Sequence, residues 1–512
     1  MVQAKIRRVT ESDKERLFIW ANDPVTREQS FSKEPISWEN HCAWFAQKMQ
    51  DGSCYHYILE VDNEPVGVLR LDCCEAVCGE NAYRISYSVA PGQRGHGYGK
   101  KLLQFAEYHA VTDIPDCAVL LGEVKEKNTA SVKCFESTGF DRTEVWDDGN
   151  VDGREKELCF KKHLDRKACV VFRADANAAV GNGHVMRCLT IADACFKVGM
   201  YPIFVCAGPD AKALIQDRGY AVKVLGTDYR KMTEELCEWK EWIPAGSFVV
   251  LDSYYLNKEY VNALRKKGYQ TVWLDDTGEQ KYEVDLLINY NLYAAELGYE
   301  SRYEDEHTKC LLGAAYAPVR PAFYKKGYQV RNRLERVMIT TGAADPYRVG
   351  FFFAEELAKS GLVKEINVVC GPYHDDVLRL QELATRVGEN GQTQIKILQN
   401  LSDLSDVMYH SDLVIAAAGG TLYELCAVGV PAFTYLFADN QRQGALAFAK
   451  QAKSVCLGDV RTDIDRMREV LCEEIKKYQS FACREALSRY MRGVSDGRGA
   501  ERIAEIMKRF WE

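Results

Sequence analysis

The chain has 512 residues and a net charge of −8, with 47% hydrophobic and 27% charged residues. This length exceeds what a single hydrophobic core organises, so we expect two to four domains. The composition is that of a soluble globular protein. The acidic balance offers no basic footprint for nucleic acid, so we expect no nucleic-acid partner.

Targeting and redox signals indicate a cytoplasmic protein. The first residues, 1–17, contain no apolar segment of the kind that a secretory signal peptide needs. The most apolar tract, residues 413–437, is interrupted by glycines, a proline and a carboxylate, which favours a buried strand–loop–helix–strand over a bilayer helix. The 19 cysteines are scattered, and the cluster at Cys73, Cys74 and Cys78 lacks metal-ligand spacing. We therefore expect no membrane span and no metal, whereas the oligomeric state stays open.

Apolar runs predict a mixed sheet with helices in the first 163 residues. A turn at Asp62–Pro65 separates two such runs, which is a hairpin signal. A later strand leads through a glycine-rich loop into a helix. The expected elements are the strands Lys5–Val9, Tyr55–Val61, Val66–Asp72, Tyr83–Val89 and Leu120–Lys125 and the helix Lys100–His109.

The glycine-rich loop at residues 93–99 reads QRGHGYG. Repeated glycines at a helix start let the backbone approach a pyrophosphate, and the helix N-terminus favours its negative charge. The spacing differs from a dinucleotide fingerprint, and no acidic residue ends a following strand at the expected distance. The loop resembles the acetyl-CoA loop of the GNAT superfamily of N-acetyltransferases. Asn128 and the segment CFESTGF at 134–140 continue that resemblance.

The resemblance implies a GNAT domain that uses acetyl-CoA as co-substrate. Val89 would polarise the thioester carbonyl through its backbone, and Asn128 would contact the pantetheine arm. Glu123 would be the general base that deprotonates the attacking amine, and a surface strand residue is the alternative reading. Phe135 stands where the superfamily usually has a tyrosine as general acid, so protonation of the leaving thiolate stays open. The pyrophosphate would bind backbone amides of the loop, at Arg94, Gly95, Gly97 and Gly99.

After a charged junction at residues 161–167, strands and helices alternate in two successive sets. Such alternation is typical of parallel sheets, and two sheets imply two Rossmann-like halves with ligands at the carboxyl ends of their strands. We expect a GNAT domain at 1–165 and Rossmann-like halves at 168–328 and 329–512, and we expect fragments cut at the junction each to keep one activity. The predicted strands are Cys169–Phe172, Tyr201–Cys206, Val222–Leu225, Phe248–Asp252, Thr271–Leu274 and Leu286–Asn289, then Arg336–Thr341, Ile366–Cys370, Ile395–Leu398, Leu413–Ala417, Ala432–Tyr435 and Val455–Leu457.

A glycine loop, GNGH at residues 181–184, follows the first strand of the first set. A helix that begins near His184 would present backbone amides, such as that of Gly183, to a diphosphate. Histidine is the side chain best suited to proton transfer near neutral pH. Arg187 lies three residues further and faces the same side of the helix entrance. From the spacing alone, a plain turn followed by a helix-capping histidine explains the pattern equally well.

Glycine and carboxylate motifs also follow three strands of the second set. A glycine pair at a helix start suits a phosphate, and a carboxylate one turn further suits ribose hydroxyls. The residues predicted to bind the nucleotide are Gly342, Gly419, Gly420, Thr421, Glu424, Asn440 and Gln441.

The second set resembles the nucleotide half of GT-B glycosyltransferases of the lipid II-forming type. Five motifs in order (RADAN with GNGHxxR, LDSYY, LLGAAYAPVRPAF, GGTxxE and Asn-Gln) make the whole region similar to UDP-sugar hydrolases of the pseudaminic acid pathway. This implies that His184 activates a water for attack on the anomeric carbon with inversion, and that Tyr254 contacts the sugar. Because UDP is already a good leaving group, no general acid is needed. Asp275 and Asp276 are expected to be loop caps.

Together the two resemblances imply consecutive steps on one sugar nucleotide. The first acetylates the 4-amine of UDP-4-amino-4,6-dideoxy-β-L-AltNAc, and the second releases UDP by hydrolysis. The acetyltransferase fold alone would permit other amines. Three alternatives stay open: the second region is a glycosyltransferase with its own acceptor, the substrate belongs to another diamino-trideoxy-sugar route, or the two regions together only bind sugar nucleotides without catalysis. UDP formation without an acceptor would exclude the first, and turnover would exclude the last.

Overall fold

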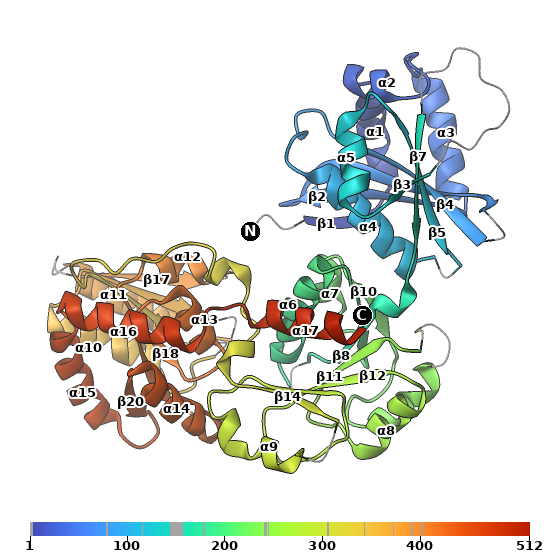
Figure 1. Cartoon of the computed structure of the whole chain (residues 1–512). Helices are drawn as coiled ribbons and strands as arrows, with labels where there is room; N and C mark the ends of the chain where they lie inside the picture. Colours follow the sequence, from blue (N-terminus) through green and yellow to red (C-terminus); the bar gives the residue numbers. More distant parts are fainter. Residues whose placement is uncertain are drawn as a thin grey trace. The chain divides into compact units, whose positions relative to one another are not determined.

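A computed structural model shows three sheets among the residues that it describes, each with its own helices (Figure 1). By their internal contacts the residues fall into two compact units, 1–185 with 199–270, and 186–198 with 271–512. The predicted division at 165 and 328 stays a prediction. The described residues are 4–77, 80–114, 116–143, 157–177, 180–239, 243, 245–304, 307–342, 344–371, 373–389, 391, 393–399, 401 and 403–511.

The first sheet is mixed, and its strands lie in the order β1-β2-β3-β4-β5-β7-β6. Neighbouring strands are antiparallel except β4 and β5, which are parallel. Helix α4 packs against β3 and β4, and its C-terminal half is buried. The strands are β1 (Ala4–Arg8), β2 (Cys54–Val61), β3 (Glu64–Val77), β4 (Glu80–Val89), β5 (Val119–Lys125), β6 (Asp141–Thr143) and β7 (Glu157–His163). The helices are α1 (Lys14–Ala21), α2 (Pro24–Gln29), α3 (Trp38–Gln50), α4 (Tyr98–Thr112) and α5 (Thr129–Ser137).

The second sheet is parallel, with strand order β10-β9-β8-β11-β12-β13-β14. Its strands are β8 (Cys169–Ala174), β9 (Tyr201–Cys206), β10 (Ala221–Val224), β11 (Phe248–Asp252), β12 (Gln270–Leu274), β13 (Leu286–Asn289) and β14 (Lys309–Leu312). Its helices are α6 (Gly183–Lys197), α7 (Lys212–Asp217), α8 (Lys258–Lys266) and α9 (Tyr299–Arg302), with the 3₁₀ helix η3 (Met232–Trp239).

The third sheet is also parallel, in the order β17-β16-β15-β18-β19-β20. Its strands are β15 (Arg336–Thr340), β16 (Glu365–Cys370), β17 (Gln394–Gln399), β18 (Leu413–Ala417), β19 (Ala432–Leu436) and β20 (Val455–Asp459). The helices are α10 (Val349–Ser360), α11 (Val377–Glu389), α12 (Ser405–His410), α13 (Thr421–Val428), α14 (Arg442–Ala452), α15 (Ile464–Lys477), α16 (Phe481–Val494) and α17 (Gly499–Trp511).

Both parallel sheets have the doubly wound order in which the chain starts at the centre and reverses direction after three strands. The reversal lies between β8 and β11 in one sheet and between β15 and β18 in the other. In open parallel sheets the ligand crevice forms at the carboxyl ends of the strands at this switch point. The predicted α/β class with two Rossmann-type halves is confirmed, and the fold singles out the loops after these four strands.

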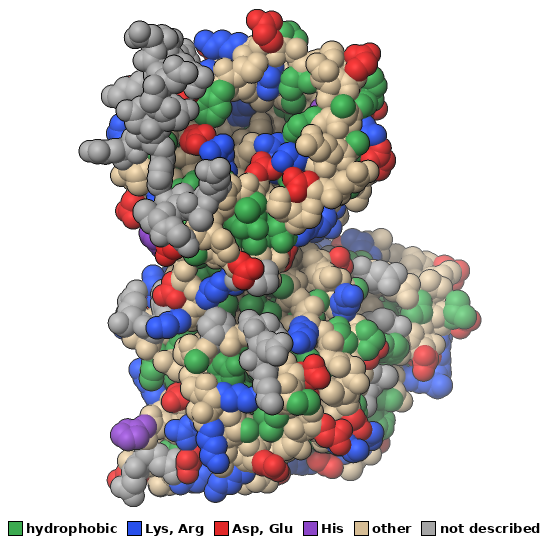
Figure 2. Space-filling model, turned by 90° about the vertical axis from the view of Figure 1, so that its right-hand side faces the viewer, with side chains coloured by type: hydrophobic (Ala, Val, Ile, Leu, Met, Phe, Trp, Pro, Cys, Tyr) green, Lys and Arg blue, Asp and Glu red, His purple; other side chains and the backbone are tan. Residues whose placement is uncertain are grey.

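Charged side chains of both signs are interspersed on the face drawn in Figure 2. None of the helices in the described ranges combines the length and the apolar character needed to cross a membrane.

Candidate functional site

In the first sheet, the pairing between the parallel strands β4 and β5 ends where the acetyl-CoA site is predicted. Their register runs from Ala82↔Val119 to Ile85↔Gly122, whereas β4 continues to Val89 and β5 to Lys125. Val89 pairs on its other side with Gly67 of β3. The β4 edge that lies beyond Ile85 is therefore outside the β4–β5 ladder, which suits the predicted backbone contact of Val89 to a thioester.

The loop before α4 presents its backbone rather than side chains. Gly95 and Gly97 have positive φ angles of 86° and 79°, and Gly97 is the N-cap of α4. A Cβ at either position would meet no atom within 4 Å, so both glycines face open space. Gly99 differs, because a Cβ there would lie 3.1 Å from Cys134 Sγ. A side chain at position 99 would need Cys134 to move by a few tenths of an ångström, whereas the other two glycines leave open space at a helix N-terminus, which suits an anion.

Replacing Gly97 by valine is expected to weaken binding of coenzyme A about 10- to 100-fold, because backbone hydrogen bonds to a charged group would be blocked. Isothermal titration with coenzyme A measures the effect. Gly92→Val is the matched control, since Gly92 has nearly the same φ of 81° but precedes the loop. Equal losses in both variants would assign the effect to backbone strain and remove Gly97 from the binding site.

Three residues predicted to serve the acetyl-CoA site have side chains with partners within the protein. Arg94 Nη2 donates to Asp23 Oδ2 at 2.5 Å and to Thr26 Oγ1 at 3.0 Å. Asn128 Oδ1 caps α5 by accepting from the Ser131 amide at 3.2 Å. Glu123 is part-exposed on β5, with Oε1 3.2 Å from an Arg84 guanidinium nitrogen. Each role predicted for these residues stays a prediction.

Phe135 is buried and stacks on Phe160 with ring centroids 5.0 Å apart. A hydroxyl that the sequence analysis missed lies nearby, on Tyr87 of β4, whose ring centroid is 6.0 Å from that of Phe135. Tyr87 Oη lies 2.8 Å from Ser131 Oγ. Burial raises the pKa of Tyr87, although the hydrogen bond with Ser131 opposes the shift, so this phenol keeps its proton.

In the second sheet, His184 lies in the first turn of α6, directly after the loop that follows β8. Its Nδ1 is 2.5 Å from Oδ1 of Asp252, the last residue of β11, so the ring donates to this carboxylate. His184 is 7% exposed and Asp252 is 1% exposed. The Tyr254 ring meets the imidazole edge to face at 4.7 Å and is itself 62% exposed. A carboxylate on Nδ1 fixes the tautomer and directs Nε2 to a different partner.

A helix-capping role for His184 does not by itself explain its contacts. It accounts neither for the buried Asp252 carboxylate nor for the exposed Tyr254 ring beside the imidazole. The sequence predicts Asp252 only as the end of a strand. In the structure Asp252 pairs in register with Ala174, the last residue of β8, and its carboxylate contacts His184. A buried histidine–aspartate pair at a switch point is a typical arrangement for a general base.

The second unit contains the other charged residues predicted around α6. Arg187 Nη1 donates to both carboxylate oxygens of Asp276, at 3.0 and 2.8 Å, and to Tyr290 Oη at 2.9 Å. Asp276 is therefore an ion-pair partner of Arg187. Asp275 does cap its loop, by accepting from the amides of Thr277 and Gly278 at 3.0 and 3.1 Å.

The third sheet places the predicted nucleotide motifs at its switch point. Gly342 follows β15 with a φ of 84° and is exposed. Gly419 and Gly420 are exposed after β18, and Gly420 is the N-cap of α13. Thr421 is the first residue of this helix. The structure thus brings the two glycine motifs to adjacent strands, since β15 pairs with β18.

Glu424 lies in the first turn of α13, where Oε1 accepts from Arg320 Nη2 at 3.1 Å. Burial raises the pKa of Glu424, and the Arg320 charge opposes that shift. The Gln441 side chain accepts from the Phe437 amide at 3.1 Å and so stabilises the loop after β19. The side chain of Asn440 lies outside the described residues. The nucleotide contacts of these residues stay predictions.

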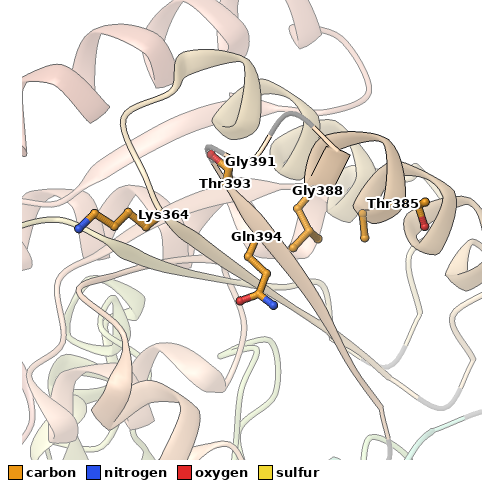
Figure 3. Close-up of a pocket in the computed structure, with 8 residues that line it drawn as sticks. Lys364, Thr385, Gly388, Gly391, Thr393 and Gln394 are labelled. Atoms are coloured by element: carbon orange, nitrogen blue, oxygen red, sulfur yellow. The ribbon is translucent and has the colours of Figure 1, made fainter.

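A pocket of about 530 Å³ lies at the opposite edge of the third sheet (Figure 3). It is lined by Lys364 and Gln394, at the amino ends of β16 and β17, and by Thr385 and Gly388 of α11. None of the predicted site residues lines it. Among the residues that the structure describes, no group of three or more His, Cys, Asp or Glu side chains is arranged to hold a metal ion.

Comparisons with known proteins match two separate parts of the chain. Residues 16–140 match the Acetyltransferase (GNAT) family, and residues 352–495 match the Glycosyltransferase family 28 C-terminal domain.

Three curated relatives match about half of the chain. The UDP-2,4-diacetamido-2,4,6-trideoxy-beta-L-altropyranose hydrolase of Campylobacter jejuni is 23% identical over 290 residues, which are 56% of this chain and 98% of the relative. The uncharacterized protein MJ1062 of Methanocaldococcus jannaschii is 25% identical over 280 residues, 52% of this chain and 56% of the relative. The spore coat polysaccharide biosynthesis protein SpsG of Bacillus subtilis is 24% identical over 223 residues, 41% of this chain and 61% of the relative. The chain thus spans less than two thirds of the latter two relatives.

These matches confirm the predicted fusion at the level of domains. The chain carries a GNAT-family acetyltransferase domain followed by a glycosyltransferase family 28 C-terminal domain.

Proposed function

We propose that the chain catalyses two consecutive steps on a UDP-linked amino sugar: N-acetylation by acetyl-CoA, then hydrolysis that releases UDP. The observation that carries the second step is the buried His184–Asp252 pair at the switch point of the second sheet. The Campylobacter relative is named as a UDP-2,4-diacetamido-2,4,6-trideoxy-beta-L-altropyranose hydrolase, which supports the same substrate class. The GNAT match of residues 16–140 supports the first step.

In the hydrolysis, a water oxygen attacks the anomeric carbon while the bond from this carbon to the UDP oxygen breaks. Nε2 of His184 takes the proton from the water, while Nδ1 keeps its own proton and donates a hydrogen bond to Asp252. The buried carboxylate stabilises the imidazolium that forms. UDP leaves as an anion without protonation, because a diphosphate is a stable leaving group. Attack from the face opposite UDP inverts the anomeric centre.

The third sheet would hold UDP. The exposed backbone at Gly419 and Gly420 opens α13, where unsatisfied amides and the helix dipole favour the diphosphate. Glu424 lies one turn further and would accept from ribose hydroxyls. Its partner Arg320 brings a positive charge to the same helix start. Gly183 and Arg187, at the start of α6, are proposed to contact the UDP-sugar, and Tyr254 is proposed to contact the sugar.

In the acetylation, the amine nitrogen attacks the thioester carbonyl, the amide bond forms and coenzyme A leaves as its thiolate. Glu123, on the part of β5 beyond the β4–β5 ladder, would remove the proton from the amine. The acceptor that fits a following hydrolase is the 4-amine of the UDP-amino sugar. Other amines remain acceptors in principle, because the GNAT fold serves many of them.

Incubation with acetyl-CoA and the UDP-amino sugar, followed by mass spectrometry, tests the whole proposal. We expect coenzyme A, UDP and the free diacetamido sugar, with the acetylated UDP-sugar as an intermediate. The match to a glycosyltransferase domain favours one rival, transfer of the sugar to an acceptor. UDP release that requires an added acceptor would establish that rival and overturn the hydrolase.

Glu123→Gln is expected to slow acetyl transfer about 100-fold near neutral pH, a typical loss for a general base. The loss should be larger at low pH, where more of the amine carries its extra proton, and smaller at high pH. Coenzyme A release measured across the pH range checks this. Glu126→Gln, directly after the end of the same strand, is the control and should retain the profile. An unchanged pH–rate profile in Glu123→Gln would remove this residue from the mechanism.

A further inference from the structure

A buried ionic cluster lies at the carboxyl end of β8 and has no part in the chemistry described above. It consists of Arg173, Asp175, Glu235 and Tyr260, and we call it the Arg173 cluster. The side chains of Arg173 and Glu235 are both 0% exposed. Arg173 Nε donates to Glu235 Oε2 at 2.8 Å, and its two terminal nitrogens form ion pairs with Glu235 and Asp175.

The cluster stays charged because the positive charge of Arg173 and the negative charges of the two carboxylates stabilise one another. Burial alone would lower the pKa of Arg173, but the two carboxylates raise it above its ordinary value. Tyr260 Oη donates to Glu235 Oε2 at 3.2 Å. Burial raises the pKa of Tyr260 well above its usual range, so the phenol stays a donor. Removing one charge would leave a buried partner uncompensated, which destabilises the local structure more than loss of a surface pair does.

The cluster connects three segments at the carboxyl edge of the second sheet. Asp175 follows β8, and its Oδ1 accepts from the Ala207 amide, just after β9, at 2.8 Å. Thr227 Oγ1, from the segment after β10, donates to Glu235 Oε1 at 3.3 Å. This edge is the one at which the ligand crevice of a parallel sheet forms. The cluster therefore orders the first residue of the loop that leads to His184.

The register of β8 and β11 relates the cluster to the catalytic pair. Arg173 pairs with Leu251, and the next rung pairs Ala174 with Asp252. The guanidinium and the carboxylate that holds His184 are thus anchored one residue apart on the same two strands. His184 follows β8 through the loop that begins at Asp175, whereas Asp252 belongs to β11. A shift of β8 against β11 would therefore change the distance between the imidazole and the carboxylate, and a hydrogen bond of this kind tolerates little displacement.

We propose that Arg173 and Glu235 are positioning residues for His184: their buried ion pair fixes the end of β8 and the start of the following loop, so that Nδ1 of the histidine meets Asp252. The proposal rests on the proposed function of His184 as general base. The proposed nucleotide contacts do not explain the RADAN motif, and this proposal gives the motif a role.

Glu235→Gln tests it, because the variant keeps the side-chain size and removes one charge. In the full-length protein we expect kcat for UDP release to fall about 10- to 100-fold, with KM changed less than about threefold. The pH dependence should shift in the same direction as in Asp252→Asn. Acetylation should continue, which shows that the acetyltransferase domain is folded. Glu356→Gln is the matched control, since Glu356 is a buried carboxylate paired with Lys359 on α10, and it should behave as wild type.

If Glu235→Gln does not fold, Asp175→Asn replaces it, because the amide oxygen can still accept from Ala207 while the charge facing Arg173 is lost. Wild-type kcat and pH profile in the variant would overturn the proposal. Activity that falls only in proportion to the folded fraction, with an unchanged pH profile, would also overturn it and leave a purely structural cluster. The proposed function fails separately, if His184→Asn still releases UDP.

Discussion

Replacing His184 by asparagine is expected to abolish UDP release while coenzyme A release continues, so that the acetylated UDP-sugar accumulates. Loss of a general base slows a reaction by about 10²–10⁴-fold. The imidazole lies in the first turn of α6 and is held by the buried Asp252 carboxylate, and an asparagine at this position cannot take a proton from water. Nucleotide binding should survive, because the third sheet is proposed to supply it. Chromatography of both products during one time course measures the two steps together.

His410→Asn is the control for this experiment, because His410 is exposed on α12 and bonds only within its own helix turn among the contacts described. Hydrolysis in oxygen-18 water adds an independent check. Attack at the anomeric carbon puts the label in the sugar, and none in UDP. Label in the UDP phosphate would mean attack at phosphorus, and His184 could not then hold the proposed role even if its replacement were inactive.

Asp252→Asn is expected to cost about 10²–10⁴-fold in kcat for UDP release, comparable to the loss seen when the carboxylate of a Ser-His-Asp triad is replaced by an amide. The amide has nearly the same shape but no charge to stabilise the imidazolium, and it can present an N–H to Nδ1 and so favour the wrong tautomer. A pH–rate profile of UDP release, compared with that of the wild type, measures this loss at each pH.

A double variant distinguishes a shared role from two separate ones. If His184 and Asp252 act as a unit, combining His184→Asn with Asp252→Asn should cost little more than His184→Asn alone. Losses that multiply would show that Asp252 acts independently of the histidine. Asp285→Asn is the matched control, because its carboxylate accepts from the Thr271 amide at 2.7 Å, in the turn before β13.

The apolar strands of both Rossmann halves could be predicted because strands of a parallel sheet are buried on both faces and stand out as continuous apolar runs. β7 and β14 could not be predicted in this way. β14 begins with the exposed Lys309, and β7 carries two consecutive lysines, so neither has a continuous apolar run. Edge and outer strands of this kind are recognised only from their neighbours in the sheet.

The same distinction between local and long-range features applies to the candidate site. The glycine loop and the histidine are local in sequence, so the position of His184 at a helix start could be predicted. Its partner Asp252 lies 68 residues away, and the contact depends on the register of β8 and β11, which sequence alone does not determine. Glu235 is similarly remote from Arg173. Asn128 shows the converse limit, since an asparagine at a helix start is equally suited to capping the helix and to binding a ligand.

The close packing of Gly122 and Phe135 constrains how this acetyltransferase domain can change in evolution. A Cβ at position 122 would lie 2.4 Å from the Phe135 ring, so no other residue fits on β5 there while the phenylalanine keeps its place. A lineage could acquire a side chain at position 122 only if position 135 changed to a smaller residue at the same time or earlier. We therefore expect the two positions to covary among related chains, with glycine at 122 wherever an aromatic ring occupies 135.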